Sequence, residues 1–175
     1  MRVNVTEIET PIGAMLAAAS DTQLVLFEFP HRRMIDTQLE RVRRAVGCEL
    51  EPGESPVFAQ LRTELDEYFA GRRRDFSIPL HAPGTPFQMR VWSELQRIPS
   101  GTTTTYARLA DAIGKPNAIR AVARANGDNR IAILIPCHRV IGSNGELVGY
   151  GGGLWRKRKL LELEARAEAL SLFPM

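Results

Sequence analysis

The sequence predicts an α+β fold: a small N-terminal β-sheet with helices, followed by a C-terminal helical domain that contains a helix-turn-helix. Near the N-terminus, three short apolar segments are separated by turn residues, which is typical of a β-meander. After residue 85, apolar residues recur at intervals of three and four, the spacing of amphipathic helices. We therefore expect an N-terminal α+β domain over residues 1–85 and a C-terminal helical domain over residues 86–175.

Three strands are expected in the N-terminal domain. The first, residues 3–10, alternates apolar and polar side chains and ends at a Pro-Ile-Gly break. The second covers residues 14–19 and ends at Ser-Asp, and the third covers residues 24–29 and stops at Pro30. Such short segments with brief turns predict a meander, because strands that follow one another in sequence usually pair.

Two helices follow these strands. Residues 34–46 have a helical pattern, and a loop over residues 52–56 leads into the second helix. Ser55 is placed to cap this helix, with Pro56 at its first position. Its apolar face consists of Phe58, Leu61, Leu65 and Tyr68, and Gly71 ends it. Residues 1–75 show no catalytic constellation.

Three helices are expected after a loop at residues 81–86. They cover residues 87–98, residues 104–114, and residues from an Asn117 cap to about 126. The inward faces are expected to be Val91, Trp92 and Leu95, then Tyr106, Leu109, Ala110 and Ile113, then Ile119, Val122 and Ala123. The last two helices, joined by a short glycine-containing turn, match the helix-turn-helix pattern.

The second helix of this pair is basic. Arg120 and Arg124 lie four residues apart and project from one face. Residues 1–86 carry 10 basic and 13 acidic side chains, whereas residues 87–175 carry 13 basic and 7 acidic ones. A basic C-terminal half favours a polyanionic partner such as nucleic acid, although a mildly basic solvated surface would give the same count.

The composition limits the class of protein. Of 175 residues, 44% are apolar and 25% charged, as in globular proteins. The longest apolar run, residues 131–136, is far shorter than the about 20 residues of a membrane-spanning helix, and no secretory signal is visible. Cys48 and Cys137 are too few for a disulfide framework or a four-cysteine zinc site. We expect a reducing, cytoplasmic location.

The most informative segment is Ile131–Val140, where the apolar run ends at Pro136 and Cys137 and His138 follow directly. Regular strand pairing stops at proline, which has no N–H to donate. A buried run with cysteine and histidine at its end suggests a reactive thiol in a pocket, because a nearby imidazole lowers the thiol pKa from about 8.5. The dipeptide alone is not specific, since a buried cysteine is usually an inert apolar residue.

Pro136–Val140 resembles the active-site signature of the O(6)-alkylguanine-DNA alkyltransferases, also called methylated-DNA–protein-cysteine methyltransferases. Further segments resemble this family in order and spacing between about residues 86 and 166: Phe87–Trp92, Gly101–Tyr106, Asn117–Val122, Asp128–Asn129, Gly149–Leu154 and Leu160–Glu164. The resemblance implies that an alkylated guanine is flipped out of duplex DNA. Its alkyl group then moves irreversibly to Cys137 in a single turnover, with O(4)-alkylthymine as a second candidate substrate.

The resemblance assigns catalytic roles to four residues. Cys137 accepts the alkyl group, His138 acts on it through a water molecule, and Glu164 orients the imidazole. Asn129 matches an asparagine that braces the turn holding the cysteine. We expect this relay to lower the thiol pKa, and a lowering of about 1.5 units corresponds to about 2 kcal/mol.

The resemblance also assigns residues to the flipped base. Tyr106 donates a hydrogen bond towards the guanine, and the carbonyls of Cys137 and Val140 accept from its amino group. Tyr150 belongs to a lid loop, and the N–H of Gly151 reaches the base oxygen. The glycines at 151–153 are expected to make this loop mobile and to admit larger alkyl groups.

For DNA, the resemblance assigns to Arg120 the side chain that enters the base stack from the minor groove and fills the gap. Thr104 and Ala121 lie in matched segments and are assigned to DNA as well. Arg124 is expected to be a solvated residue, and Arg139 a salt-bridged scaffold residue. The basic run over residues 156–159 is interpreted as a solvated helix face.

We expect no metal and no cofactor. Some relatives hold a structural zinc in the N-terminal half, but His31, Cys48 and His81 do not match that pattern. The expected partner is double-stranded DNA that carries alkylated guanine. No membrane and no required protein partner are expected, and cooperative self-association on DNA is left open.

Three other functions compete with this interpretation. A non-catalytic lesion-binding protein of the same fold would flip the base without transfer, and such relatives replace the cysteine at position 137. A transcription regulator would use the helix-turn-helix in the major groove, with a footprint that follows sequence rather than lesion. A Cys–His hydrolase would turn over repeatedly on an ester or peptide.

Overall fold

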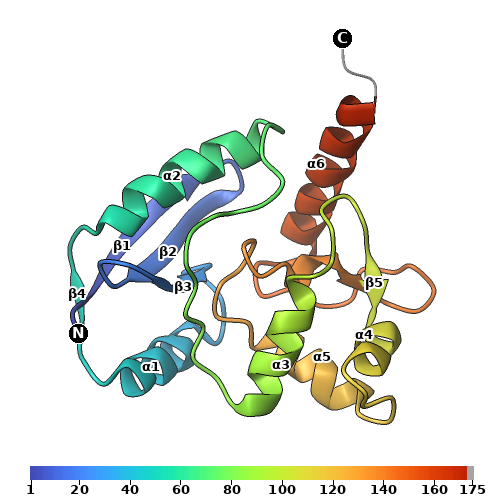
Figure 1. Cartoon of the computed structure of the whole chain (residues 1–175), viewed down its shortest axis with the longest axis horizontal. Helices are drawn as coiled ribbons and strands as arrows, with labels where there is room; N and C mark the ends of the chain where they lie inside the picture. Colours follow the sequence, from blue (N-terminus) through green and yellow to red (C-terminus); the bar gives the residue numbers. More distant parts are fainter. Residues whose placement is uncertain (173–175) are drawn as a thin grey trace.

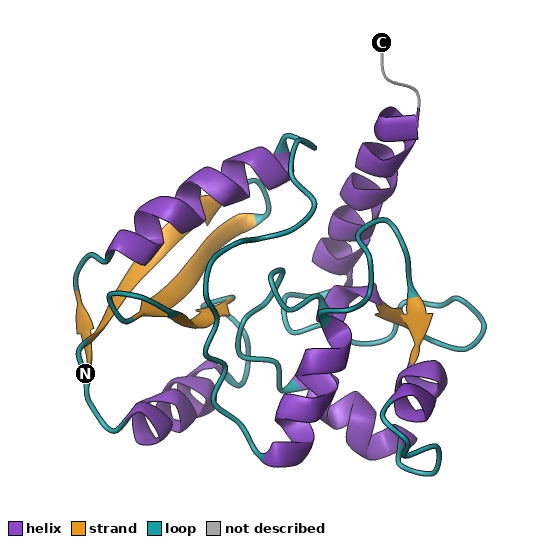
Figure 2. Cartoon of the chain, viewed as in Figure 1, coloured by secondary structure: helices purple, strands orange, loops and turns teal. Residues whose placement is uncertain are grey.

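The α+β fold class is confirmed by the computed structural model, which describes residues 1–172. The strands gather in the N-terminal half, and the C-terminal half is mostly helical (Figure 2). In chain order the elements are β1 (Val3–Thr10), β2 (Gly13–Ala19), β3 (Leu24–Glu28), α1 (Ile35–Val46), β4 (Leu50–Pro52), α2 (Pro56–Phe69), α3 (Pro86–Leu95), β5 (Thr104–Thr105), α4 (Tyr106–Ala112), α5 (Ile119–Gly127), the 3-10 turn η1 (Cys137–Arg139), β6 (Val140–Ile141) and α6 (Leu154–Leu172). No helix among these is long and apolar enough to cross a membrane.

The first three strands form the expected meander, with β2 antiparallel to both β1 and β3. The sheet has a fourth strand, β4, which was expected to lie partly in a loop and instead runs parallel to β1. Leu50 pairs with Val3, and Pro52 pairs with Val5 at the sheet edge. Three residues that end in proline give almost no local strand signal, so this pairing depends on the finished sheet.

Helices cover both faces of the sheet, with α2 on one side and α1 on the other (Figure 1). The alternation of side chains along β2 separates the two layers: Ala17 and Ala19 join the core under α2, whereas Ala18 packs with Val42 of α1. The cap expected for α2 is present, because Oγ of Ser55 accepts a hydrogen bond from the N–H of Val57 at 3.1 Å.

The larger core continues without a break into the C-terminal half. Phe27 of β3, Trp92 of α3, Val122 of α5 and Leu160 of α6 all belong to it and are at most 2% exposed. Trp92 also satisfies its indole N–H, which donates to the carbonyl of Ala125 at 2.8 Å. The two halves therefore share one hydrophobic interior, and the site described below lies along their junction.

Two details of the helix-turn-helix differ from the expectation. Helix α5 begins at Ile119, and no side chain caps it, because residues 115–118 form a turn in which Asn117 is exposed. Ile119 is 41% exposed and does not face inward. In addition, Thr104 and Thr105 are not helical: they pair in parallel with Val140 and Ile141, directly after the Cys-His-Arg turn. This pairing holds the start of α4 beside the thiol segment.

Candidate functional site

The segment before Cys137 is a tight buried turn rather than a strand. All residues from Ile131 to Val140 are buried. The N–H of Ile135 donates to the carbonyl of Ile131 at 3.0 Å, and that of Cys137 donates to Ile135 at 2.8 Å. Within residues 1–172, Ile133 alone among non-glycine residues has a positive φ, at 70°. A β-branched residue is strained in this conformation, so the surroundings must impose it.

Two asparagines hold this turn from inside. The side-chain amide of Asn129 donates to Ile135 at 2.8 Å, and its oxygen accepts from the N–H of Ile131 at 3.1 Å. The amide of Asn126 donates to the carbonyl of Cys137 at 3.4 Å. Both asparagines are buried, so these bonds are not shared with solvent. These hydrogen bonds fix the backbone of the turn and therefore the position of Cys137.

Cys137 lines a cavity of about 150 Å³ that also includes Tyr106, Tyr150 and Gly151. These residues come from α4 and from the loop before α6, and the structure brings them together as one wall. Val140 is fully buried and does not line this cavity, because its backbone pairs with Thr104 instead. The cavity therefore gathers most, but not all, of the residues assigned to the base.

The loop over this cavity is fastened from two sides. The hydroxyl of Tyr106 donates to the carbonyl of Val148 at 2.9 Å. The ammonium group of Lys157 donates to the same carbonyl at 3.1 Å and to that of Gly149 at 3.2 Å. Lys157 is 0% exposed, so the interpretation of residues 156–159 as a solvated helix face is wrong at this position. A buried ammonium needs such carbonyl partners.

The N-terminal half supplies the remaining wall, although no functional residue was expected there. Three residues line the cavity here: Glu28, which ends β3, Phe29, which follows it, and Arg32, three residues further on. Arg32 lies 2.5 Å from the carboxylate of Glu28 and donates to the carbonyl of Gly127 at the end of α5. Burial raises the pKa of the Glu28 carboxyl, while Arg32 opposes this effect. In the sequence these residues look like an ordinary strand end.

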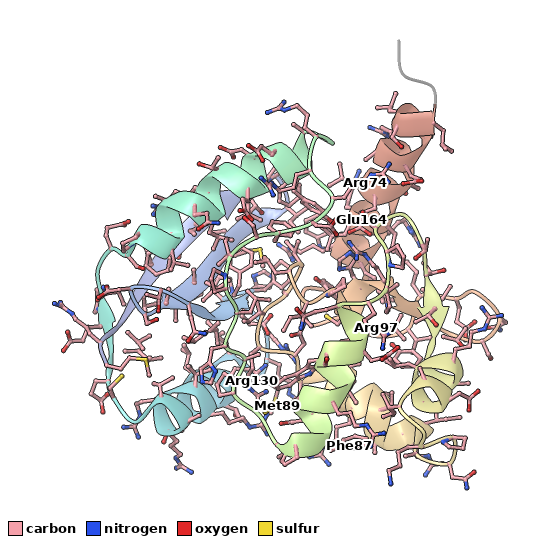
Figure 3. All side chains as sticks on the ribbon, in the orientation of Figure 1. Arg74, Phe87, Met89, Arg97, Arg130 and Glu164 are labelled. Carbon is pink, nitrogen blue, oxygen red and sulfur yellow. The ribbon has the colours of Figure 1, made fainter. Side chains whose placement is uncertain are left out.

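Behind Cys137, the imidazole of His138 contacts Glu164 of α6, with 2.7 Å between Nε2 and Oε1. Figure 3 places Glu164 on α6 close to the end of α2. Both side chains are buried. Nδ1 of His138 has no hydrogen-bond partner within residues 1–172. Because a carboxylate can only accept, Nε2 carries the proton and Nδ1 presents a free lone pair.

Two further residues bind the same carboxylate. The guanidinium of Arg139 donates to both oxygens of Glu164 at 2.9 Å, which confirms the expected scaffold salt bridge. The hydroxyl of Tyr68, on α2, donates to Oε1 at 2.7 Å. Glu164 thus accepts four hydrogen bonds, and the charges and hydrogen bonds of His138 and Arg139 hold its pKa far below the ordinary value despite burial.

The electrostatics of the resting thiol differ from the expectation. Burial raises the pKa of the Cys137 thiol, although the Asn129 hydrogen bond and the charges of Arg32 and Lys157 act against this. Burial also lowers the pKa of His138, in spite of the neighbouring Glu164 carboxylate. The resting site therefore holds a neutral thiol and a neutral imidazole, because a desolvated ion pair would cost more than it gains.

The residues assigned to DNA lie outside the cavity. Arg120 and Ala121 are exposed on α5, and Thr104 is half-buried in β5. Arg124, which was expected to be a solvated residue, is also exposed on α5. The inner side of α5 lines the cavity through Ala123, Asn126 and Gly127. One helix therefore carries basic side chains on its solvent face and part of the thiol cavity on its other face.

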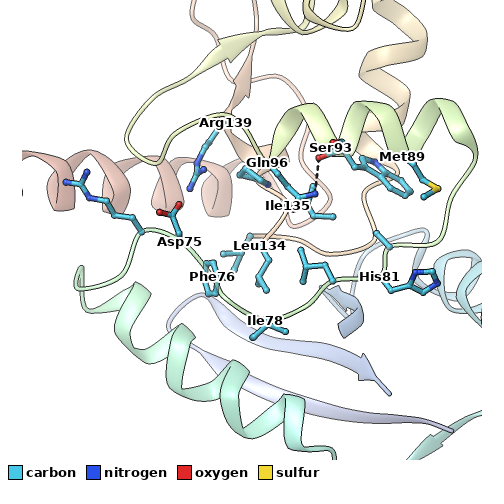
Figure 4. Close-up of a pocket in the computed structure, with 16 residues that line it drawn as sticks. Asp75, Phe76, Ile78, His81, Met89, Ser93, Gln96, Leu134, Ile135 and Arg139 are labelled. Atoms are coloured by element: carbon cyan, nitrogen blue, oxygen red, sulfur yellow. Dashed lines mark hydrogen bonds between the residues drawn. The ribbon is translucent and has the colours of Figure 1, made fainter. Parts of the chain in front are cut away.

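A larger cavity of about 460 Å³ opens between residues 74–82 and α3 (Figure 4). It touches Ile135 and Arg139 but does not include Cys137 or His138. Within residues 1–172, no group of three or more histidine, cysteine or acidic side chains is placed to hold a metal ion.

The fold and the site together define a two-part protein with a helix-turn-helix and a buried cysteine that faces a small cavity. Models of two protein domains match the chain. Residues 4–82 match the ribonuclease-like domain, and residues 86–166 match the DNA-binding domain, of 6-O-methylguanine DNA methyltransferase. The chain belongs to this family.

Similar proteins span nearly the whole chain. The methylated-DNA--protein-cysteine methyltransferase of Mycobacterium leprae is 44% identical over 170 residues, which is 97% of each chain. The constitutive enzyme of Bacillus subtilis is 42% identical over 147 residues, covering 84% of this chain and 86% of its own. A crystal structure of Mycobacterium tuberculosis OGT in complex with DNA has a TM-score of 0.79 at 40% identity, covering 95% of this chain and 94% of that one.

Proposed function

We propose that this chain repairs alkylated DNA by transferring the alkyl group from the position-6 oxygen of guanine to Sγ of Cys137, in a single turnover. The observation that carries this proposal is the buried Cys137 at a small cavity, with a carboxylate-bound imidazole next to it in sequence. The names of its relatives, methylated-DNA–protein-cysteine methyltransferases, support an alkyl-accepting cysteine. O(4)-alkylthymine is a second candidate substrate of the same pocket.

The position of the cavity requires that the base leave the duplex. Cys137 is 8% exposed, so its sulfur cannot reach a stacked base. We assign Arg120 to the gap in the stack, because it lies on the exposed face of the helix whose other face lines the cavity. Ala121 and Thr104 are assigned to the neighbouring DNA backbone.

Inside the cavity, the base is recognised by groups that surround Cys137. The hydroxyl of Tyr106 exchanges its contact with Val148 for one with the guanine, and the N–H of Gly151 donates to the base oxygen. Tyr150 packs against the base from the loop, and its ring is supported by Phe29 at a centroid distance of 5.8 Å. The carbonyl of Cys137, a residue that lines the cavity, accepts from the exocyclic amino group.

In the transfer, Nδ1 of His138 accepts the thiol proton through a water molecule while Sγ attacks the alkyl carbon. A carbon–sulfur bond forms as the bond between that carbon and the guanine oxygen breaks. The electron pair of the broken bond stays on the base, which takes up a proton and leaves as guanine. Overall, the thiol proton replaces the alkyl group, and no cofactor or oxidant takes part. The thioether has no route back to the thiol, so each molecule acts once.

The proposed partner is double-stranded DNA that carries alkylated guanine. The basic face of α5 supplies the attraction, and no protein partner is needed for the reaction. Cooperative self-association on DNA is compatible with this scheme. We place the protein in the cytoplasm, where a reducing environment keeps Cys48 and Cys137 as thiols.

Mass spectrometry after incubation with duplex DNA that contains one O(6)-methylguanine tests the proposal. We expect a gain of one CH₂ unit, located on Cys137, with one transfer per molecule. Cys137→Ser should bind DNA without transferring, because a hydroxyl is a far weaker nucleophile at neutral pH. Cys48→Ser is the matched control and should react as the wild type does. Methyl transfer by the Cys137→Ser protein, or repeated turnover by the wild type, would overturn the proposal.

A further inference from the structure

Tyr68 is the one residue of α2 that reaches the buried carboxylate of the relay. It lies 96 positions before Glu164 in the chain, and its hydroxyl donates to Oε1 at 2.7 Å. Tyr68 is 2% exposed, so water does not share this contact. The ring is held by edge contact with Phe69 at a centroid distance of 5.2 Å and by Phe76 at 5.4 Å. The hydroxyl is therefore presented from a fixed position.

Each donor to Glu164 constrains the carboxylate differently. Arg139 binds both oxygens, and this fork fixes the plane of the carboxylate. Oε1 alone receives both the Tyr68 hydroxyl and Nε2 of His138, each at 2.7 Å. Tyr68 thus acts on the very oxygen that sets the direction of the imidazole.

We infer that Tyr68 is a positioning residue of the alkyl-transfer site, and that its hydroxyl fixes Oε1 of Glu164 against the imidazole of His138. The inference rests on the proposed relay through His138. It gives the N-terminal half a part in positioning the relay, because Tyr68 belongs to the segment that matches the ribonuclease-like domain.

A second consequence concerns charge. A hydrogen bond from Tyr68 disperses the negative charge on Oε1, so less of that charge is available to stabilise a protonated His138. The charged and titratable groups that face this cluster are Arg139 from η1, Glu164 and Lys157 from α6, Tyr68 from α2, and Tyr150 from the loop before α6. Removing the hydroxyl leaves Arg139 and Lys157 unchanged and makes Glu164 a stronger partner of His138. The pKa of His138 should then rise.

The test compares Tyr68→Phe with the unsubstituted protein, both in the full-length Cys48→Ser background, so that Cys137 is the reacting thiol. Two rates are followed against pH, namely transfer from free O(6)-benzylguanine and alkylation of Cys137 by iodoacetamide. The imidazole of His138 is titrated by NMR in the same proteins. The free base and the small electrophile need no base flipping, so DNA binding does not enter either rate.

We expect Tyr68→Phe to react about tenfold more slowly, by analogy with metal-binding histidines, where loss of the partner that orients the ring costs about 10–100-fold. The acid limb of its rate profile and the His138 titration should both move to higher pH. Phe76→Leu is the control, because it disturbs the packing of the Tyr68 ring and leaves the hydroxyl in place. It should lower stability without moving the His138 titration.

Two results would overturn the inference: an unchanged His138 titration in Tyr68→Phe, or an equal shift in Phe76→Leu. A protein that reacts with iodoacetamide but not with O(6)-benzylguanine or methylated DNA would contradict the proposed function instead. The titration and iodoacetamide measurements would still decide the role of Tyr68 in that case.

Discussion

The side-chain amide of Asn129 lies 2.8 Å from the carbonyl oxygen of Ile135, two residues before Cys137. The same side chain accepts from the N–H of Ile131, so it joins the two ends of a turn that contains Ile133 at a positive φ. Such a backbone conformation costs about 1–3 kcal/mol and persists only where its surroundings enforce it. Asn129 provides that constraint from the centre of the turn.

Replacing Asn129 with alanine should therefore affect both stability and transfer. The change leaves the buried N–H of Ile131 without a partner, at a cost of about 1–3 kcal/mol, and removes one of the two donors to the carbonyl of Ile135. We expect a loss of about 2 kcal/mol in the free energy of unfolding, measured by urea denaturation. Transfer should slow as well, because Cys137 is no longer held in place.

Asn144→Ala is the matched control, since Asn144 is exposed in a surface turn. It should change the free energy of unfolding by less than about 0.5 kcal/mol. A similar small effect for Asn129→Ala would contradict the bracing role.

Gly152 lies close to Phe29 of the N-terminal half. A Cβ at this residue would lie 2.6 Å from the ring of Phe29. Gly152→Ala should therefore displace the loop or the ring and slow the reaction with both methylated DNA and O(6)-benzylguanine. Gly127→Ala places the same methyl group on another cavity-lining glycine, where nothing lies within 4 Å. That control should react normally, and equal effects of the two changes would argue against the close contact.

Arg120 and Arg124 form a matched pair, because both are exposed on α5 and only Arg120 is assigned to the base stack. Extruding a paired base costs a few kcal/mol, and a side chain that fills the gap recovers part of this. Arg120→Ala should strongly slow repair of duplex DNA and should change transfer from free O(6)-benzylguanine much less. Arg124→Ala should weaken DNA binding only by the attraction of one phosphate contact.

The transfer rates with duplex DNA and with free O(6)-benzylguanine test whether Arg120 acts in the base stack. If Arg120→Ala slows transfer from duplex DNA and from the free base by the same factor, Arg120 serves the pocket or the fold. Its role in the base stack must then be abandoned.

The depressed pKa of Glu164 predicts how stability depends on pH. A carboxyl whose pKa is lower in the folded protein stabilises it above the pKa of the unfolded chain, about 4.3. This contribution is lost as the pH falls below that value towards the folded pKa. The free energy of unfolding of the wild type should therefore begin to fall at about pH 4 and should continue to fall as the pH is lowered further.

Urea denaturation across this range should show a shallower decline for Glu164→Gln, which is also less stable at neutral pH. Glu162→Gln, an exposed change on the same helix, should keep the slope of the wild type. Parallel curves for wild type and Glu164→Gln would mean that the carboxylate contributes no charge-dependent stability.

Local signals were enough to predict most elements and the reactive motif. The Ser55–Pro56 start of α2, the apolar face that includes Phe58 and Leu61, and the meander at the N-terminus are all present. Each depends on contacts within a few residues, which the sequence displays directly. The Cys137–His138 pair is likewise adjacent in the chain, so its chemistry could be considered before any fold was known.

Other features depend on how distant segments pack, and the sequence does not display these. Tyr68 looks like one more apolar residue on a helix face, Arg32 like a residue in a surface turn, and Lys157 like part of a solvated basic run. In the structure, Tyr68 meets Glu164, Arg32 contacts the end of α5, and Lys157 is buried against the carbonyls of the loop. The physical reason is the distance along the chain over which each feature is determined. Helix caps and short strands depend on residues that are neighbours in the chain. The partners of a buried polar group depend on the shared core, which brings the two halves together.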